Sequence, residues 1–200
     1  MKKRGLLLTA ALMLVLGGCG FSDDVDTTTL IVDKKGEVTE AIVEDFDKDY
    51  YNADELKQEI EGTVLNYNSL AGEDKAALEA FEKDEQTNVL KVRISYATAA
   101  DYTQMNEREL FCGTVSDAYN AGYQFVTMTT ADGSSISETE VLEKGSSKIV
   151  IYEGGKSAVN VKVSGKISYI SAESGIVLND RADTASLPEG EGKLFYLIYE

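Results

Sequence analysis

The stretch Leu90-Lys91-Val92-Arg93-Ile94-Ser95-Tyr96 alternates strictly between apolar and polar side chains. Successive side chains of an extended strand point to opposite faces, so this pattern predicts a half-buried β-strand. A sheet with one apolar face needs a second layer to cover it. The preceding residues, 71–85, leave two readings open. Their alanines and acids favour a helix, but they also lie where the hairpin partner of the strand would be.

A helix further upstream suits the covering layer. Asn52, with Glu55 three residues later, has the spacing of a capping box at a helix N-terminus. The residues that follow place apolar side chains on one face, which we expect to pack against a sheet. These apolar residues are Leu56, Ile60, Val64 and Tyr67.

The remaining segments indicate a strand-rich chain with a few more helices. Residues 30–32 and 38–46 flank a turn that ends in Gly36, which predicts a hairpin. Residues 99–108 and 114–122 are expected to be short helices. Branched and aromatic residues predict strands at 124–130, 148–152, 159–170, 175–178 and 193–199, with a polar loop at 181–192. The sequence therefore predicts an α+β fold, with a mostly antiparallel sheet, two to four helices in the N-terminal two thirds and a strand-rich C-terminal third.

The N-terminus has the layout of an export signal. Lys2, Lys3 and Arg4 precede an apolar run, residues 6–16, that is shorter than the roughly 20 residues of a membrane-spanning helix. The run closes on Leu16-Gly17-Gly18-Cys19, which resembles the lipobox of bacterial lipoproteins processed by signal peptidase II. The resemblance implies cleavage between Gly18 and Cys19 and a diacylglyceryl group, with palmitate-like acyl chains, on the Cys19 thiol. The alternative is an ordinary secretory signal in which Cys19 is incidental.

The resemblance also implies an organisation and a location. Residues 1–18 would be the signal peptide, 19–27 a lipidated tether, and 28–200 a single extracytoplasmic α+β domain, with 132–147 as the seam if there are two halves. The domain would be anchored on the outer face of the cell membrane through the lipid on Cys19. The acidic composition, the low proline content and the lack of histidine resemble those of uncharacterised surface lipoproteins of clostridia-like Gram-positive bacteria.

The composition narrows the classes of partner and of catalytic site that are open to this protein. The net charge is −16 and falls to −19 once the three basic residues of the signal are removed. Such a surface repels nucleic acid and favours a cationic partner, divalent cations or simple solubility. The chain has no histidine, which excludes Ser-His-Asp and Cys-His catalysis and imidazole-bound zinc. Cys112 is the one cysteine left after lipidation, and its apolar neighbours predict a buried small side chain.

The candidate site residues are few. Asp45, Asp47 and Asp49 recur at alternate positions, and closely spaced carboxylates suit calcium. The EF-hand pattern is absent because its glycine and glutamate positions hold Tyr50 and Leu56. An irregular, weak calcium site and a solvated strand end that leads into a helix both remain open. Tyr50-Tyr51, beside the acidic run, is a candidate binding surface, and the alternative is that these rings pack at the edge of the core as tyrosines commonly do.

These observations predict a non-enzymatic binding or interaction domain at the cell envelope, tethered to the membrane and meeting an envelope ligand or partner protein of unknown identity. No catalytic residue, cofactor or bound metal is assigned. The alternative is a hydrolase of envelope or dietary polymers that works through paired carboxylates.

Overall fold

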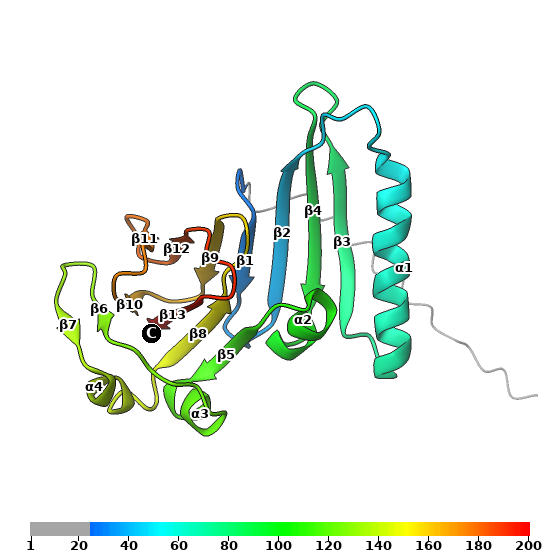
Figure 1. Ribbon diagram of the computed structural model, residues 1–200. Helices are drawn as coiled ribbons and strands as arrows, with labels where there is room; N and C mark the ends of the chain where they lie inside the picture. The colour runs from blue at the N-terminus through cyan, green and yellow to red at the C-terminus, as the bar shows by residue number, and fades with distance from the viewer. Residues whose placement is uncertain (1–24) are drawn as a thin grey trace, which may run out of the picture.

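The computed structural model describes residues 25–200, which form two β-sheets with helices packed against them (Figure 1). The fold class is α+β, as predicted, although the strands form two sheets rather than one. The expected signal peptide, the cleavage site, Cys19 and most of the tether lie outside the described residues.

Sheet A has seven strands in the order β11-β12-β9-β1-β2-β4-β3. Its strands pair antiparallel except β1 and β9, which run parallel, with Thr29 opposite Asn160. The strands are β1 (Thr29–Val32), β2 (Val38–Asp45), β3 (Ala76–Lys83), β4 (Val89–Tyr96), β9 (Val159–Val163), β11 (Val177–Leu178) and β12 (Thr184–Leu187).

Sheet B has six antiparallel strands in the order β5-β8-β13-β10-β6-β7. Its central strands β8 and β13 are the longest, and its outer strands are short. The strands are β5 (Leu110–Thr114), β6 (Met128–Thr129), β7 (Ser135–Ile136), β8 (Lys148–Glu153), β10 (Ile167–Ser171) and β13 (Leu194–Tyr199).

The helices of residues 25–200 are α1 (Ala53–Ala71), α2 (Ala99–Asn106), α3 (Val115–Asn120) and α4 (Glu138–Leu142). Asn52 caps α1 as predicted, because its side chain accepts hydrogen bonds from the backbone amides of Asp54 and Glu55. Thr114 and Asp117 form a reciprocal capping box on α3. None of the described helices combines the length and apolar character needed to cross a membrane.

The alternating stretch from Leu90 to Tyr96 lies in β4, and its predicted alternation is confirmed. Leu90, Val92, Ile94 and Tyr96 are buried on one face of sheet A. That face is covered by three neighbours in turn: α1 over β3 and β4, then α2, then sheet B (Figure 1). Pairing register places Lys91, Arg93 and Ser95 on the opposite, polar face with Thr39, Ala41 and Val43.

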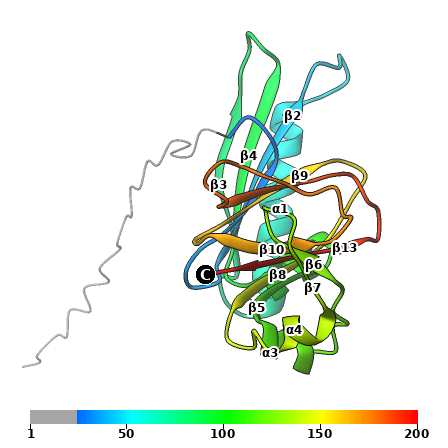
Figure 2. The same ribbon diagram turned by 90° about the vertical axis from the view of Figure 1, so that its left-hand side faces the viewer.

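Sheet B is buried on both faces at its centre. In β8 and β13, alternate residues such as Val150 and Leu197 pack against sheet A in one apolar cluster. The residues between them, such as Ile149 and Ile198, join a second cluster with α3 and α4. Figure 2 shows the β8, β13 and β10 strands in front, with α1 behind them on the far side of sheet A. This double burial explains why β8 and β13 read as continuous apolar runs.

Three expectations about secondary structure are settled or corrected. Residues 71–85 contain the hairpin partner of β4, so the strand reading of that segment is the right one. The single strand expected at 159–170 is wrong, because β9 and β10 are separated near Gly165, where a Cβ would clash with the backbone carbonyl of Glu200. The polar loop expected at 181–192 contains β12, whose small residues are weak strand formers.

The segment 132–147 holds β7 and α4, and both pack on the side of sheet B. The chain passes between the two sheets several times, and one apolar cluster includes residues of both. The division of residues 28–200 into one domain or two halves stays a prediction.

Candidate binding surface

The predicted acidic residues lie at one end of sheet A, where β2 leads into α1. Asp45 is the last residue of β2, and Asp47 and Asp49 follow in the connection. All three are exposed, and Asp47 pairs with Lys48 at 3.0 Å. Across residues 25–200 no group of three His, Cys, Asp or Glu side chains is placed to hold a metal ion. The calcium site stays a prediction without a ligand cluster to support it.

Three aromatic rings gather among these carboxylates. The ring centroids of Phe46 and Tyr51 are 4.8 Å apart, and those of Tyr50 and Tyr51 are 4.9 Å apart in an edge arrangement. Both distances lie in the range of favourable aromatic pairs. The Tyr50 side chain is 79% exposed and Tyr51 is 43% exposed. Residues 45–51 are termed the acidic tip, and the structure brings the predicted tyrosine pair and the predicted acids together there.

Backbone contacts hold the acidic tip in place. The Phe46 amide donates to the Asn88 carbonyl in the β3–β4 turn at 2.7 Å, and the Tyr51 amide donates to the Lys48 carbonyl at 3.0 Å. The cap at Asn52 then fixes the start of α1 directly after the tip. In the same β3–β4 turn, backbone amides that donate to the Asp84 carboxylate lower its pKa. The tip is therefore an ordered acidic surface, with its rings held at the end of a sheet.

A partly buried carboxyl group at the junction of the two sheets was missed by sequence reasoning. Glu40 in β2 lies on the apolar face of sheet A and accepts a hydrogen bond from the Tyr96 hydroxyl at 3.1 Å. The Asn106 amide of α2 donates to the same tyrosine oxygen at 3.0 Å. Burial raises the pKa of Glu40, and Tyr96, Arg108 and Tyr102 oppose this shift. The available signal was the position of Glu40 in β2, where it alternates with the apolar residues Val38 and Ile42.

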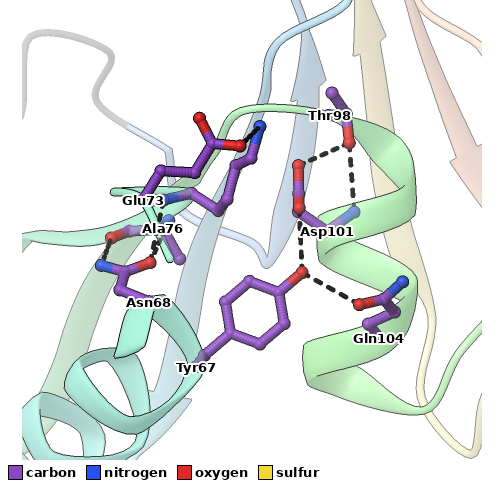
Figure 3. A network of polar contacts seen from close by, with 8 residues as sticks. Tyr67, Asn68, Glu73, Ala76, Thr98, Asp101 and Gln104 are labelled. Atoms are coloured by element: carbon purple, nitrogen blue, oxygen red, sulfur yellow. Dashed lines mark hydrogen bonds and ion pairs between the residues drawn. The ribbon is translucent and has the colours of Figure 1, made fainter. Parts of the chain in front are cut away.

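A second polar network fixes α2 against α1 (Figure 3). The Tyr67 hydroxyl of α1 donates to Asp101 at 2.9 Å, and the Thr98 hydroxyl donates to the other oxygen of Asp101 at 2.5 Å. Burial and the Asp101 carboxylate raise the pKa of Tyr67 to about 12. Close by, the Asn68 side chain bonds to the backbone of Lys75 and Ala76 at the start of β3. These contacts make α2 a firm wall for the surface beside it.

That surface is an open groove along the outer edge of sheet B, here named the edge groove. It consists of two adjoining depressions of about 640 and 610 Å³ that share Glu109, Phe111 and Tyr123. The first depression is bounded by the β1–β2 turn, α2 and β5. The second is bounded by the end of α3, Val126 and the start of β13. No sequence motif marked this groove, because its walls come from five separate segments.

Three further titratable groups bear on the hydrolase alternative, which stays a prediction. Cys112, predicted to be buried, is partly buried and packs against the core, and burial raises the pKa of its thiol to about 12. A glycosidase needs a general acid whose pKa is raised and a second carboxylate close by. Glu40 has the raised pKa, but its charged neighbour is Arg108. Asp183, in a groove beside Val25, has a pKa lowered by the Asn179 side chain.

The chain matches no protein-family model, no curated protein and no solved structure.

Proposed function

We propose that this protein is a lipid-anchored extracytoplasmic domain that binds a basic partner at the cell envelope through its acidic tip. The observation that carries the proposal is the exposed aromatic stack of Phe46, Tyr51 and Tyr50 set among exposed carboxylates. Tyrosine faces and carboxylates together suit ammonium and guanidinium groups, which bind over a ring and pair with an acid.

Charge supports the choice of partner. The net charge of −16 attracts cationic surfaces over distances of about 10 Å at moderate salt and raises the rate of encounter. Aromatic side chains at the tip then supply contact area that does not depend on salt. An ordered tip loses little conformational freedom on binding, because its backbone is already hydrogen-bonded to the β3–β4 turn.

The anchor is supported by the N-terminal sequence. Cys19 stands six residues before Val25, where the described domain begins. Six extended residues span at most about 20 Å, so a lipid on Cys19 would keep the domain close to the membrane surface. Two acyl chains give stable retention, whereas one gives marginal retention.

The binding proposal is tested with deca-lysine as the probe and the full chain in mild detergent, measured by calorimetry at low and moderate salt. We expect saturable binding that weakens with salt, and the variant Tyr50→Ala to bind about two- to fivefold more weakly, since an exposed cation–π contact contributes about 0.5–1 kcal/mol.

The matched control is Tyr119→Ala, which removes another exposed tyrosine from α3, well away from the tip in sequence. Equal loss in both variants, or unchanged binding by Tyr50→Ala, would overturn the tip as the binding surface. Deca-glutamate should not bind at either salt concentration.

A further inference from the structure

We propose that the outer edge of β5 binds a short extended peptide as an added strand, paired with Cys112, and that the peptide alternates apolar and basic side chains. This surface is separate from the acidic tip, so the inference goes beyond the proposed function and does not depend on it. Four features of the edge support the proposal: the direction of its main-chain groups, the length that is open, the depressions on its two sides, and the charge between them.

The first feature is that alternate backbone groups of β5 point away from the sheet. β5 is the outermost strand of sheet B and pairs only with β8 in the described chain. The Glu153 amide donates to the Glu109 carbonyl, and the Val115 amide donates to the Ser147 carbonyl. Hydrogen-bonded pairs alternate in an antiparallel ladder, so the backbone groups of Leu110, Cys112 and Thr114 point away from β8.

The second feature is the length of the β5 edge whose backbone groups are free to bond to a partner. The Thr103 hydroxyl both donates to the Leu110 carbonyl and accepts from its amide, so it occupies both outward groups of Leu110. The Thr114 amide donates to Asp117 of α3. Between them, the amide and carbonyl of Cys112 have no hydrogen-bond partner among residues 25–200. The open edge therefore accommodates about three residues of a partner, or roughly 10 Å of extended chain.

The third feature is a depression of the surface on each side of this edge. Side chains of an added strand would alternate between the two faces of sheet B. Leu110 and Cys112 lie on the face toward sheet A and border the first depression of the edge groove. Phe111 lies on the opposite face and borders both depressions, and the rest of the second depression belongs to that opposite face. Each face of the edge thus offers a depression to alternate side chains, which is the arrangement that gives strand-addition sites their specificity.

The fourth feature is the negative charge of Glu109 between the two depressions. The Glu109 carboxylate lines both depressions and accepts a hydrogen bond from the Tyr123 hydroxyl at 2.5 Å, which fixes its position. The wall beside it, α2, is held by the contacts of Asp101 with Tyr67 and Thr98 (Figure 3). A fixed carboxylate in a partly apolar groove favours a lysine or arginine side chain on the peptide. The remaining lining is apolar or uncharged apart from Lys35, so the other side chains are apolar.

The test is a two-dimensional amide NMR titration of the full chain in mild detergent with acetyl-Val-Lys-Val-Lys-Val-amide. We expect saturable shifts centred on the amides of Cys112 and Gly113, with no shift at Tyr50 or Tyr51 of the tip. A peptide with glutamate in place of lysine should bind at least fivefold more weakly. A peptide whose central valine is N-methylated loses a main-chain donor and should also bind at least fivefold more weakly.

A blocking variant and a control complete the experiment. Ala100 is exposed and lines the first depression, so Ala100→Arg should fill it and abolish the shifts. Leu65→Arg places the same side chain on the exposed face of α1, and binding should be unchanged. Unshifted Cys112 and Gly113 amides at millimolar peptide would overturn the proposal. Equal binding of the N-methylated peptide would also overturn it, since contact would then not involve strand pairing.

Discussion

Leu197 in β13 lies at the point where the two sheets share one core. Its side chain is 0% exposed and faces sheet A, although β13 belongs to sheet B. The change Leu197→Ala removes three carbon atoms, which at about 0.8 kcal/mol each is a transfer loss of about 2.4 kcal/mol. The cavity left behind brings the usual range for such changes to about 3–5 kcal/mol. In a chain of this size each kcal/mol lowers the melting temperature by about 2–4 °C, so we expect a fall of roughly 10 °C.

The assay is urea unfolding followed by far-ultraviolet circular dichroism, combined with native-state hydrogen exchange. Because the shared core joins the sheets, amides of β4 in sheet A and of β8 in sheet B should lose protection together. Leu65→Ala is the matched control, since Leu65 is 72% exposed on α1, and its effect should stay within about 0.5 kcal/mol. Two separate unfolding transitions, or loss of protection confined to sheet B, would refute the reasoning and favour two independent halves.

Three further outcomes are expected. The variant Glu40→Gln should gain stability relative to the wild type as pH rises from 4 to 8. The reason is that the folded-state pKa of Glu40 is raised above its ordinary value of 4.5. The stabilising contribution of the protonated carboxyl group is therefore complete below pH 4.5 and is lost as pH rises through the folded pKa. Urea unfolding at several pH values measures this, and a difference that does not change with pH would contradict it. The variant Cys19→Ala should move the protein from the membrane fraction to the medium on cell fractionation, and retention in the membrane would exclude a lipid on Cys19 as the anchor. If the weak calcium site exists, millimolar calcium should raise the melting temperature of the wild type and not of Asp47→Ala; equal responses would remove Asp47 from any such site.

Local sequence patterns predicted the individual helices and strands of this fold better than the way in which those elements are arranged. The alternation of β4, the cap at Asn52 and the short helix expected within 114–122 each depend on neighbours within a few residues, and all three are confirmed. The cap of α4, in which Ser137 and Glu140 bond reciprocally, follows the same rule and was overlooked in a polar segment. β12 carried too weak a pattern, because its buried residues Ala185 and Leu187 alternate with Thr184 and Ser186 over only four positions.

The candidate sites show the same difference between what is local in sequence and what depends on assembly. The acidic tip is contiguous in sequence, so its residues could be named beforehand. The Glu40 cluster joins β2, β4 and α2. The edge groove joins still more segments, including the β1–β2 turn and the start of β13. Such groupings are set by strand order and by the packing of the sheets, which a single sequence does not reveal through spacing.

The parallel pairing of β1 with β9 has a consequence for the order of folding. Thr29 lies opposite Asn160, so this contact closes a loop of more than a hundred residues. The unit β2-α1-β3-β4 is built from neighbours in sequence and can form early, whereas β1 gains its second partner only after β9 is available. Contacts between distant residues slow folding. A chain that emerges N-terminus first would therefore expose one side of β1 for an extended time, and chaperone binding should concentrate on that strand.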